Sequence, residues 1–158
     1  MENNSALNIF RSVCFWAPFC SWMVAQLVKM TIGFTHTRKF DFSYMVSTGG
    51  MPSAHSAMVC GLCTSVGLTA GFAAPVFMVA LAFTLVTMFD ATTVRQAAGE
   101  QARLLNEIID EIRASHHIPE RKLKELLGHT RLEVFMGVII GILVGILVVS
   151  FPAVLRRP

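Results

Sequence analysis

The feature that most constrains this chain is a long apolar run near its C-terminal end. Residues 134–155 include no charged side chain, and Val, Ile and Leu dominate them. About 20 apolar residues in a helix span the roughly 30 Å hydrocarbon core of a bilayer. We therefore predict a membrane-spanning helix here and an integral membrane protein overall.

Three earlier apolar stretches complete the pattern, so we predict four spans. They cover residues 13–29, 53–73, 74–95 and 133–155. Charged residues make up 15% of the chain, against about 25% in an average soluble domain. The formal charge of +3 is too small to indicate nucleic-acid binding, so no nucleic acid is expected as a partner. The prediction is an all-α bundle of about four transmembrane helices, one membrane domain over residues 1–158.

Beyond the third span, the sequence predicts an amphipathic helical extension over residues 96–114. Its apolar residues recur at steps of four and three, which places them on one face of a helix. They are Ala98, Ala102, Leu105, Ile109 and Ile112. We favour packing of this stripe on the protein's own loops. Packing on a second copy, and so a homodimer, is the other arrangement left open.

The basic residues predict how the chain is oriented. Residues 90–133 contain seven Lys or Arg side chains, and the loop over residues 29–53 adds Arg38 and Lys39. Cytoplasmic loops of membrane proteins carry an excess of Lys and Arg. We therefore place both large loops and the helical extension in the cytoplasm, with the two chain ends on the other side.

Small residues inside the spans predict how the helices pack. Gly137, Gly141 and Gly145 stand four residues apart, a spacing that lets another helix approach closely. We favour a helix of the same chain over a dimer contact. The cysteines also lie in apolar runs and are interpreted as packing residues rather than metal ligands. They are Cys14, Cys20, Cys60 and Cys63.

A first polar cluster precedes the second span. Gly49 and Gly50 favour a tight turn, and Ser53 and His55 follow where the helix is expected to begin. A helix N-terminus presents free N–H groups and the positive end of the helix dipole, which bind anions. Ser53 would add a hydroxyl donor, with His55 in the first turn. A plain helix cap with an interfacial histidine is the alternative interpretation.

A second polar cluster precedes the last span. His129 and Glu133 stand four residues apart, so on a helix they would share one face. A carboxylate can keep one imidazole nitrogen protonated and leave the other free as a nucleophile. A surface ion pair is the alternative. A carboxylate at the membrane edge is costly without a partner, which favours a functional role.

Positive charges gather at the same end of the predicted bundle. Arg95 lies at the end of the third span, where Asp90 would either position it or only mark the interface, and Lys29 and Arg38 lie at the end of the first span. The planar fork of an arginine suits an oxyanion. Cations at the ends of spans are also common without any function, because their long side chains reach the interface.

Together, the three clusters predict phosphoryl transfer. His129 would attack phosphorus and form a phosphohistidine, while His55 would protonate the departing alkoxide and later activate water. Lys29, Arg38 and Arg95 would bind the phosphate and stabilise its charge. This chemistry requires no metal, and we expect no cofactor.

At these residues the sequence resembles the phosphatidic acid phosphatase type 2 (PAP2) and vanadium haloperoxidase superfamily, and more closely its small divergent PAP2 branch. The resemblance is carried by residues 49–57, 90–95 and 127–134, within a likeness that extends over nearly the whole chain. It implies a metal-independent phosphatase of the acid-phosphatase type. It also implies that His55 is the general acid and His129 the nucleophile.

The sequence departs from the superfamily pattern at two arginines. Leu123 stands where the third motif has an arginine six residues before the nucleophilic histidine. We favour Arg95 over Lys124 or Arg131 as its replacement. In the first motif, the expected arginine is displaced by two residues to Arg38.

The expected function is a membrane phosphatase that hydrolyses a lipid-like phosphate monoester or diphosphate. Phosphatidate, phosphatidylglycerol phosphate and polyprenyl phosphate are the candidate substrates, since an interfacial site suits an anionic headgroup with buried tails. The alternative is a non-catalytic phosphate-binding, lipid-binding or assembly protein on the same scaffold. The missing motif arginine favours this alternative.

Overall fold

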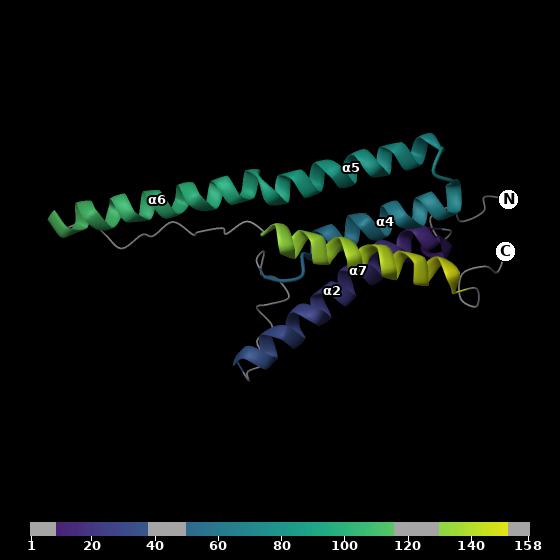
Figure 1. The fold of residues 1–158 in the computed structure, drawn as a ribbon, viewed down its shortest axis with the longest axis horizontal. Coiled ribbons are helices and arrows are strands. Elements are labelled where there is room, and N and C mark those ends of the chain that lie inside the picture. The colour runs from purple at the N-terminus through teal and green to yellow at the C-terminus, as the bar shows by residue number, and fades with distance from the viewer. Residues whose placement is uncertain (1–8, 38–49, 116–129, 152–158) are drawn as a thin grey trace.

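The computed structural model describes residues 9–37, 50–115 and 130–151, and every element in these ranges is a helix (Figure 1). This confirms the all-α prediction. In chain order the elements are η1 (Ile9–Arg11), α2 (Val13–Thr37), α4 (Ala54–Ala70), α5 (Pro75–Thr92), α6 (Val94–Ser115) and α7 (Arg131–Ser150).

Three of the described helices are long and apolar enough to cross a membrane. The corresponding segments are Val13–Thr35 in α2, Pro75–Asp110, which runs through α5 into α6, and Arg131–Ser150 in α7. The remaining predicted span, the second in chain order, is α4, which is apolar but has only 17 residues, or about 25 Å of helix. The chain is therefore an integral membrane protein with three full-length candidate spans around one shorter apolar helix.

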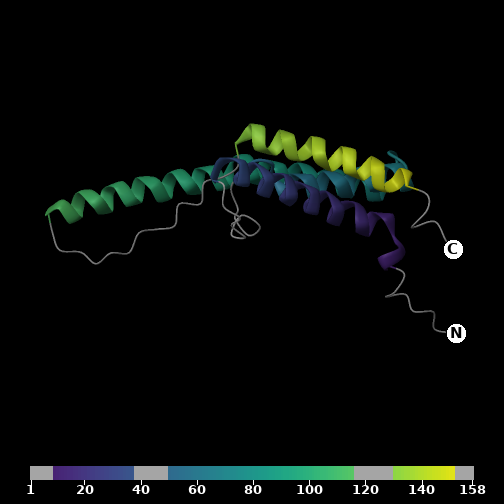
Figure 2. The same ribbon diagram turned by 90° about the horizontal axis from the view of Figure 1, so that it is seen from below.

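Helix α4 lies at the centre of the bundle and contacts α2, α5 and α7 (Figures 1 and 2). It can lie there because small residues occupy its contact surfaces. A Cβ added at Gly61 would collide with the Ser21 side chain and lie 3.1 Å from the Ala17 carbonyl oxygen of α2. On another side of α4, the Thr84 hydroxyl of α5 donates to the Val59 carbonyl at 3.2 Å.

Helix α7 packs on α4 through its three spaced glycines. A Cβ at Gly137 would collide with the Ser53 carbonyl oxygen, and one at Gly141 with the Ala57 carbonyl oxygen. A Cβ at Gly145 would lie 3.0 Å from the Thr64 Cβ. The prediction that these glycines serve packing within one chain is therefore confirmed.

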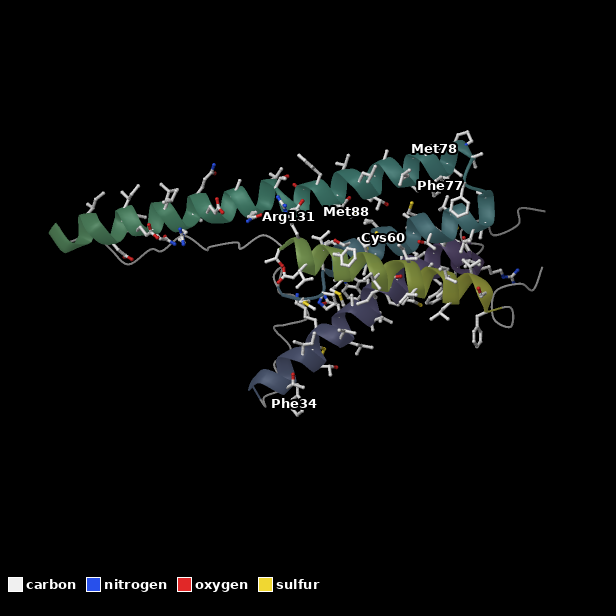
Figure 3. All side chains as sticks on the ribbon, viewed as in Figure 1. Phe34, Cys60, Phe77, Met78, Met88 and Arg131 are labelled. Atoms are coloured by element: carbon white, nitrogen blue, oxygen red, sulfur yellow. The ribbon has the colours of Figure 1, made fainter. Side chains whose placement is uncertain are left out.

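Helix α2 is longer than predicted. The first span was expected to end at Lys29, but the helix continues through Thr37. Phe34, labelled in Figure 3, lies on the part of α2 that runs away from the rest of the bundle. Lys29 is thus an internal helix residue, and the loop predicted to begin at residue 29 does not begin there.

The helix ends divide into two groups. The N-terminal ends of α4 and α7 lie at the same end of the bundle as the C-terminal parts of α2 and α5 (Figure 1). The first and last described residues lie at the other end. This is the connectivity expected of four crossings, and it brings the polar clusters before α4 and α7 to one end. Which side of the membrane that end faces stays a prediction.

Candidate functional site

The turn before α4 forms the floor of the candidate site. Gly50 has a φ of +96°, a left-handed conformation that favours glycine. Ser53 is the N-cap of α4, and its Oγ accepts from the Ser56 amide at 3.4 Å and from the Ser56 hydroxyl at 3.0 Å. Both serines are buried. The predicted cap is therefore present, and the Ser53 oxygen is engaged in holding the turn.

Lys29 lies directly against this turn although it comes from the middle of α2. Lys29 is only 5% exposed. A Cβ built on Gly50 would lie 3.1 Å from Lys29 Cε and 4.0 Å from Nζ. The backbone conformation favours glycine at residue 50, and the lysine side chain lies close to where a Cβ would stand. The ammonium group is thereby placed beside the glycine turn that leads into α4.

Glu133 connects the start of α7 to the turn before α4. The Ser53 amide donates to the Glu133 carbonyl oxygen at 3.0 Å, which ties the start of α4 to the start of α7. The Glu133 carboxylate also attracts the Lys29 ammonium group electrostatically. Three helices thus meet at a buried cation, a capped helix N-terminus and a carboxylate.

The first turn of α7 gives Glu133 a second task. Glu133 Oε2 accepts from the Thr130 amide at 2.9 Å, and the Glu133 amide donates to Thr130 Oγ1 at 3.3 Å. This reciprocal pair is a capping box. Helix α7 begins at Arg131 with Thr130 as its N-cap. His129 lies outside the described residues, so its pairing with Glu133 on one helical face stays a prediction.

The other predicted site residues are placed as follows. His55 is the second residue of α4 and is exposed, whereas its neighbours Ala54 and Ser56 are buried. Asp90 is partly buried near the end of α5, and Arg95 is in the first turn of α6. The Arg95 side chain lies outside the described part of the structure, as do the residues Arg38, Gly49 and His129.

Two features of the site were not predicted from the sequence. One is Thr130, although the spacing Thr130-x-x-Glu133 before an apolar run is itself the signal of a capping box. The other is the burial of Lys29 inside a helix. No pattern within α2 indicates it, because its carboxylate partner comes from a segment about a hundred residues later in the chain.

The described residues fit anion binding better than metal binding. A lysine beside the N-terminus of α4 combines a full positive charge with the positive end of a helix dipole. Within residues 9–37, 50–115 and 130–151, no three His, Cys, Asp or Glu residues are grouped as metal ligands would be. Cys60 faces Gly141 of α7 inside the bundle (Figure 3), in keeping with a packing role.

Comparison with known proteins agrees with this architecture. Residues 10–144 of the chain match the Divergent PAP2 family. YuiD, an uncharacterized membrane protein of Bacillus subtilis (strain 168), is 45% identical over 124 residues, which are 72% of this chain and 78% of YuiD. No solved structure matches the chain significantly. The chain belongs to the divergent PAP2 family.

Proposed function

We propose that the protein is a membrane phosphatase that hydrolyses a lipid-like phosphate monoester or diphosphate through a phosphohistidine. The observation that carries the proposal is the buried Lys29 ammonium group. It lies against the Gly50 turn at the N-terminus of α4 and is drawn toward Glu133 at the start of α7. Family membership supports the same chemistry. His129 directly precedes the Thr130 cap that Glu133 fixes.

The first step transfers the phosphoryl group to the protein. A nitrogen of neutral His129 attacks phosphorus, and a P–N bond forms as the bond from phosphorus to the ester oxygen breaks. The departing alkoxide takes a proton from the protonated imidazole of His55, the general acid. The alcohol then leaves, and the protein holds a phosphohistidine.

The second step restores the enzyme. Neutral His55 takes a proton from a water molecule, whose oxygen attacks phosphorus as the P–N bond breaks. Inorganic phosphate leaves, and His129 and protonated His55 are regenerated. Atoms and charges balance over the two steps, with one water consumed for each phosphate released.

Positive charge around the phosphate supplies the main stabilisation of the transition state. Lys29 and the α4 N-terminus act from the floor of the site, where burial strengthens electrostatic interactions. Arg38 and Arg95 would bind the remaining phosphate oxygens. Glu133 acts as a positioning residue, because it holds the turn after His129 through the capping box and holds Lys29 by its charge.

The direct test is phosphate release by the purified protein. Phosphatidate, phosphatidylglycerol phosphate and polyprenyl phosphate or diphosphate would be presented in detergent micelles with EDTA present. We expect release of inorganic phosphate from at least one of these lipids. Thermal stabilisation by inorganic phosphate without turnover of any lipid in the panel would instead indicate the non-catalytic binder.

Substitutions at Glu133 separate its two tasks. Glu133→Gln keeps an oxygen that can accept from the Thr130 amide, so the cap survives, but the negative charge beside Lys29 is lost. We expect a lower melting temperature, because an uncompensated buried cation is destabilising. We also expect inorganic phosphate to raise that temperature more than in the wild type, since the anion would replace the carboxylate. Glu133→Ala should lower the free energy of unfolding by about 1 kcal/mol more than Glu133→Gln does, because it also removes the cap.

Two controls accompany these variants. Glu107→Gln removes the same charge from an exposed residue paired with Arg103 in α6. It should change neither the melting temperature nor its increase with inorganic phosphate. Lys29→Met combined with Glu133→Gln should abolish the response to phosphate. A Glu133→Gln protein with the melting behaviour of the wild type would show that Glu133 is only a cap.

A further inference from the structure

Helix α6 carries an exposed apolar face that the described residues leave uncovered. Val94, Leu104 and Ile108 are 57%, 53% and 51% exposed, and Ala97 and Gln101 on the same face are also exposed. We call these five residues the α6 seam. The stripe predicted from the sequence overlaps only its flank, where Leu105 and Ile112 are exposed as well.

The spacing of the seam is that of a coiled coil. Its residues follow one another at steps of three, four, three and four, the a and d positions of a seven-residue repeat. Val94, Gln101 and Ile108 occupy the a positions, and Leu104 occupies a d position. Val or Ile at a with Leu at d favours two parallel strands. The pattern therefore indicates a specific kind of partner helix.

The path and the charge of α6 argue against a membrane surface as the partner. Helix α6 continues the line of α5 and extends past the bundle (Figures 1 and 2), so it leaves the bilayer with the spanning helix rather than lying along it. Its sequence has four acidic and three basic residues, a net charge of −1. Helices that lie on membranes are instead rich in Lys and Arg on their polar face.

A second copy of this chain satisfies every feature of the seam. Two copies inserted in the same orientation present parallel α6 helices at the same height, so each seam residue meets its own equivalent. A glutamine amide is both donor and acceptor, so Gln101 can hydrogen-bond to Gln101 of a second copy and fix the register. Arg103 and Glu107 pair with each other at 3.7 Å along the same helix and bring no charge onto the seam.

We propose that α6 joins two copies of the protein as a short parallel coiled coil outside the bilayer. The seam covers only two heptads, which is short for a soluble coiled coil. The membrane compensates, because α5 holds both copies in one plane and in parallel, which raises their effective concentration. Phe83 of α5, 11 residues before Val94, is also exposed, at 56%. The proposal does not depend on the phosphatase chemistry.

The test measures the mass of the full-length protein in detergent and in nanodiscs. We expect the wild type at twice 17.4 kDa and the double variant Leu104→Glu with Ile108→Glu at the monomer mass. The matched control, Gln96→Glu with Arg103→Gln, changes the charge by the same two units at exposed positions outside the seam and should stay dimeric. A monomeric wild type, or a double variant that stays dimeric, overturns the proposal.

Cross-linking in native membranes tests the seam with single substitutions that add no charge. Gln101→Cys should form a disulfide between copies under mild oxidation, at least about tenfold more than Arg103→Cys. The wild type, with its four native cysteines, sets the background. Equal cross-linking at the two positions would show that α6 does not pair through this face.

Discussion

Replacement of His129 by alanine is expected to reduce phosphate release by at least about 10⁴-fold while the protein stays folded. Loss of a nucleophile removes the covalent route altogether, and comparable deletions in other enzymes have effects of this size or larger. Lys29 and the α4 N-terminus would still bind phosphate. The Michaelis constant for the lipid should therefore change far less than kcat. The measurement is steady-state phosphate release from the best lipid of the panel.

Trapping the intermediate identifies the nucleophile directly. With a substrate labelled in its phosphate, acid-labile and alkali-stable label should remain on the wild-type protein after rapid quenching. It should be absent from His129→Ala. His117→Ala is the matched control, because it removes a histidine outside the three motifs and should keep both activity and label. Full phosphate release by His129→Ala would exclude His129 as the nucleophile.

His55 has a signature of its own. A general acid matters most when the leaving group is a poor one, such as a lipid alkoxide. His55→Ala should therefore lose much more activity toward the lipid than toward a p-nitrophenyl phosphate ester, whose leaving group needs no proton. Equal losses toward both substrates would argue that His55 is not the general acid.

The fold was largely predictable because membrane helices obey local rules. A run of about 20 apolar residues without charge indicates a span wherever it occurs. The glycine spacing of Gly137, Gly141 and Gly145 also indicates a packing face without any tertiary information. The same reasoning predicted a span over residues 53–73, but α4 has only 17 residues, Ala54–Ala70, because its apolar surface is covered by neighbouring helices on several sides.

The site was less predictable because its interactions connect distant segments. A lysine normally marks the end of a span, so the sequence placed the end of α2 at Lys29. The structure continues the helix to Thr37, and the charge is accommodated by Glu133 from α7 and by the space at Gly50. Neither partner is visible in the local sequence.

The start of α7 follows a requirement that the prediction left out. Glu133 was interpreted as a partner of His129 or as part of a surface ion pair, whereas in the structure it forms a capping box with Thr130. The capping box is the one that satisfies otherwise unpaired backbone N–H groups at the helix start, which every helix must do. That general requirement decides where α7 begins. The Glu133 carboxylate, which was assigned to catalysis, therefore accepts a hydrogen bond from the Thr130 backbone amide.

Gly141→Leu is expected to be the most damaging substitution in the bundle. Even a Cβ at this position would collide with the Ala57 carbonyl oxygen and lie 2.7 Å from the Cys60 Cβ and 3.0 Å from the Gly61 amide nitrogen. Two of these three atoms belong to the α4 backbone, which cannot rotate away as a side chain can. Helices α4 and α7 must therefore separate, at a cost above about 3 kcal/mol, the upper part of the usual range for overpacking.

The separation should also disable the site, because the packing and the chemistry share the same helix pair. The 3.0 Å bond from the Ser53 amide to the Glu133 carbonyl spans the α4–α7 contact and would be lost. Leu143→Phe, which enlarges a residue of α7 that is 56% exposed, is the control and should melt as the wild type does. Denaturant titration in detergent measures the stability of both. A Gly141→Leu protein with wild-type stability would mean that α7 does not pack on α4 through its glycines.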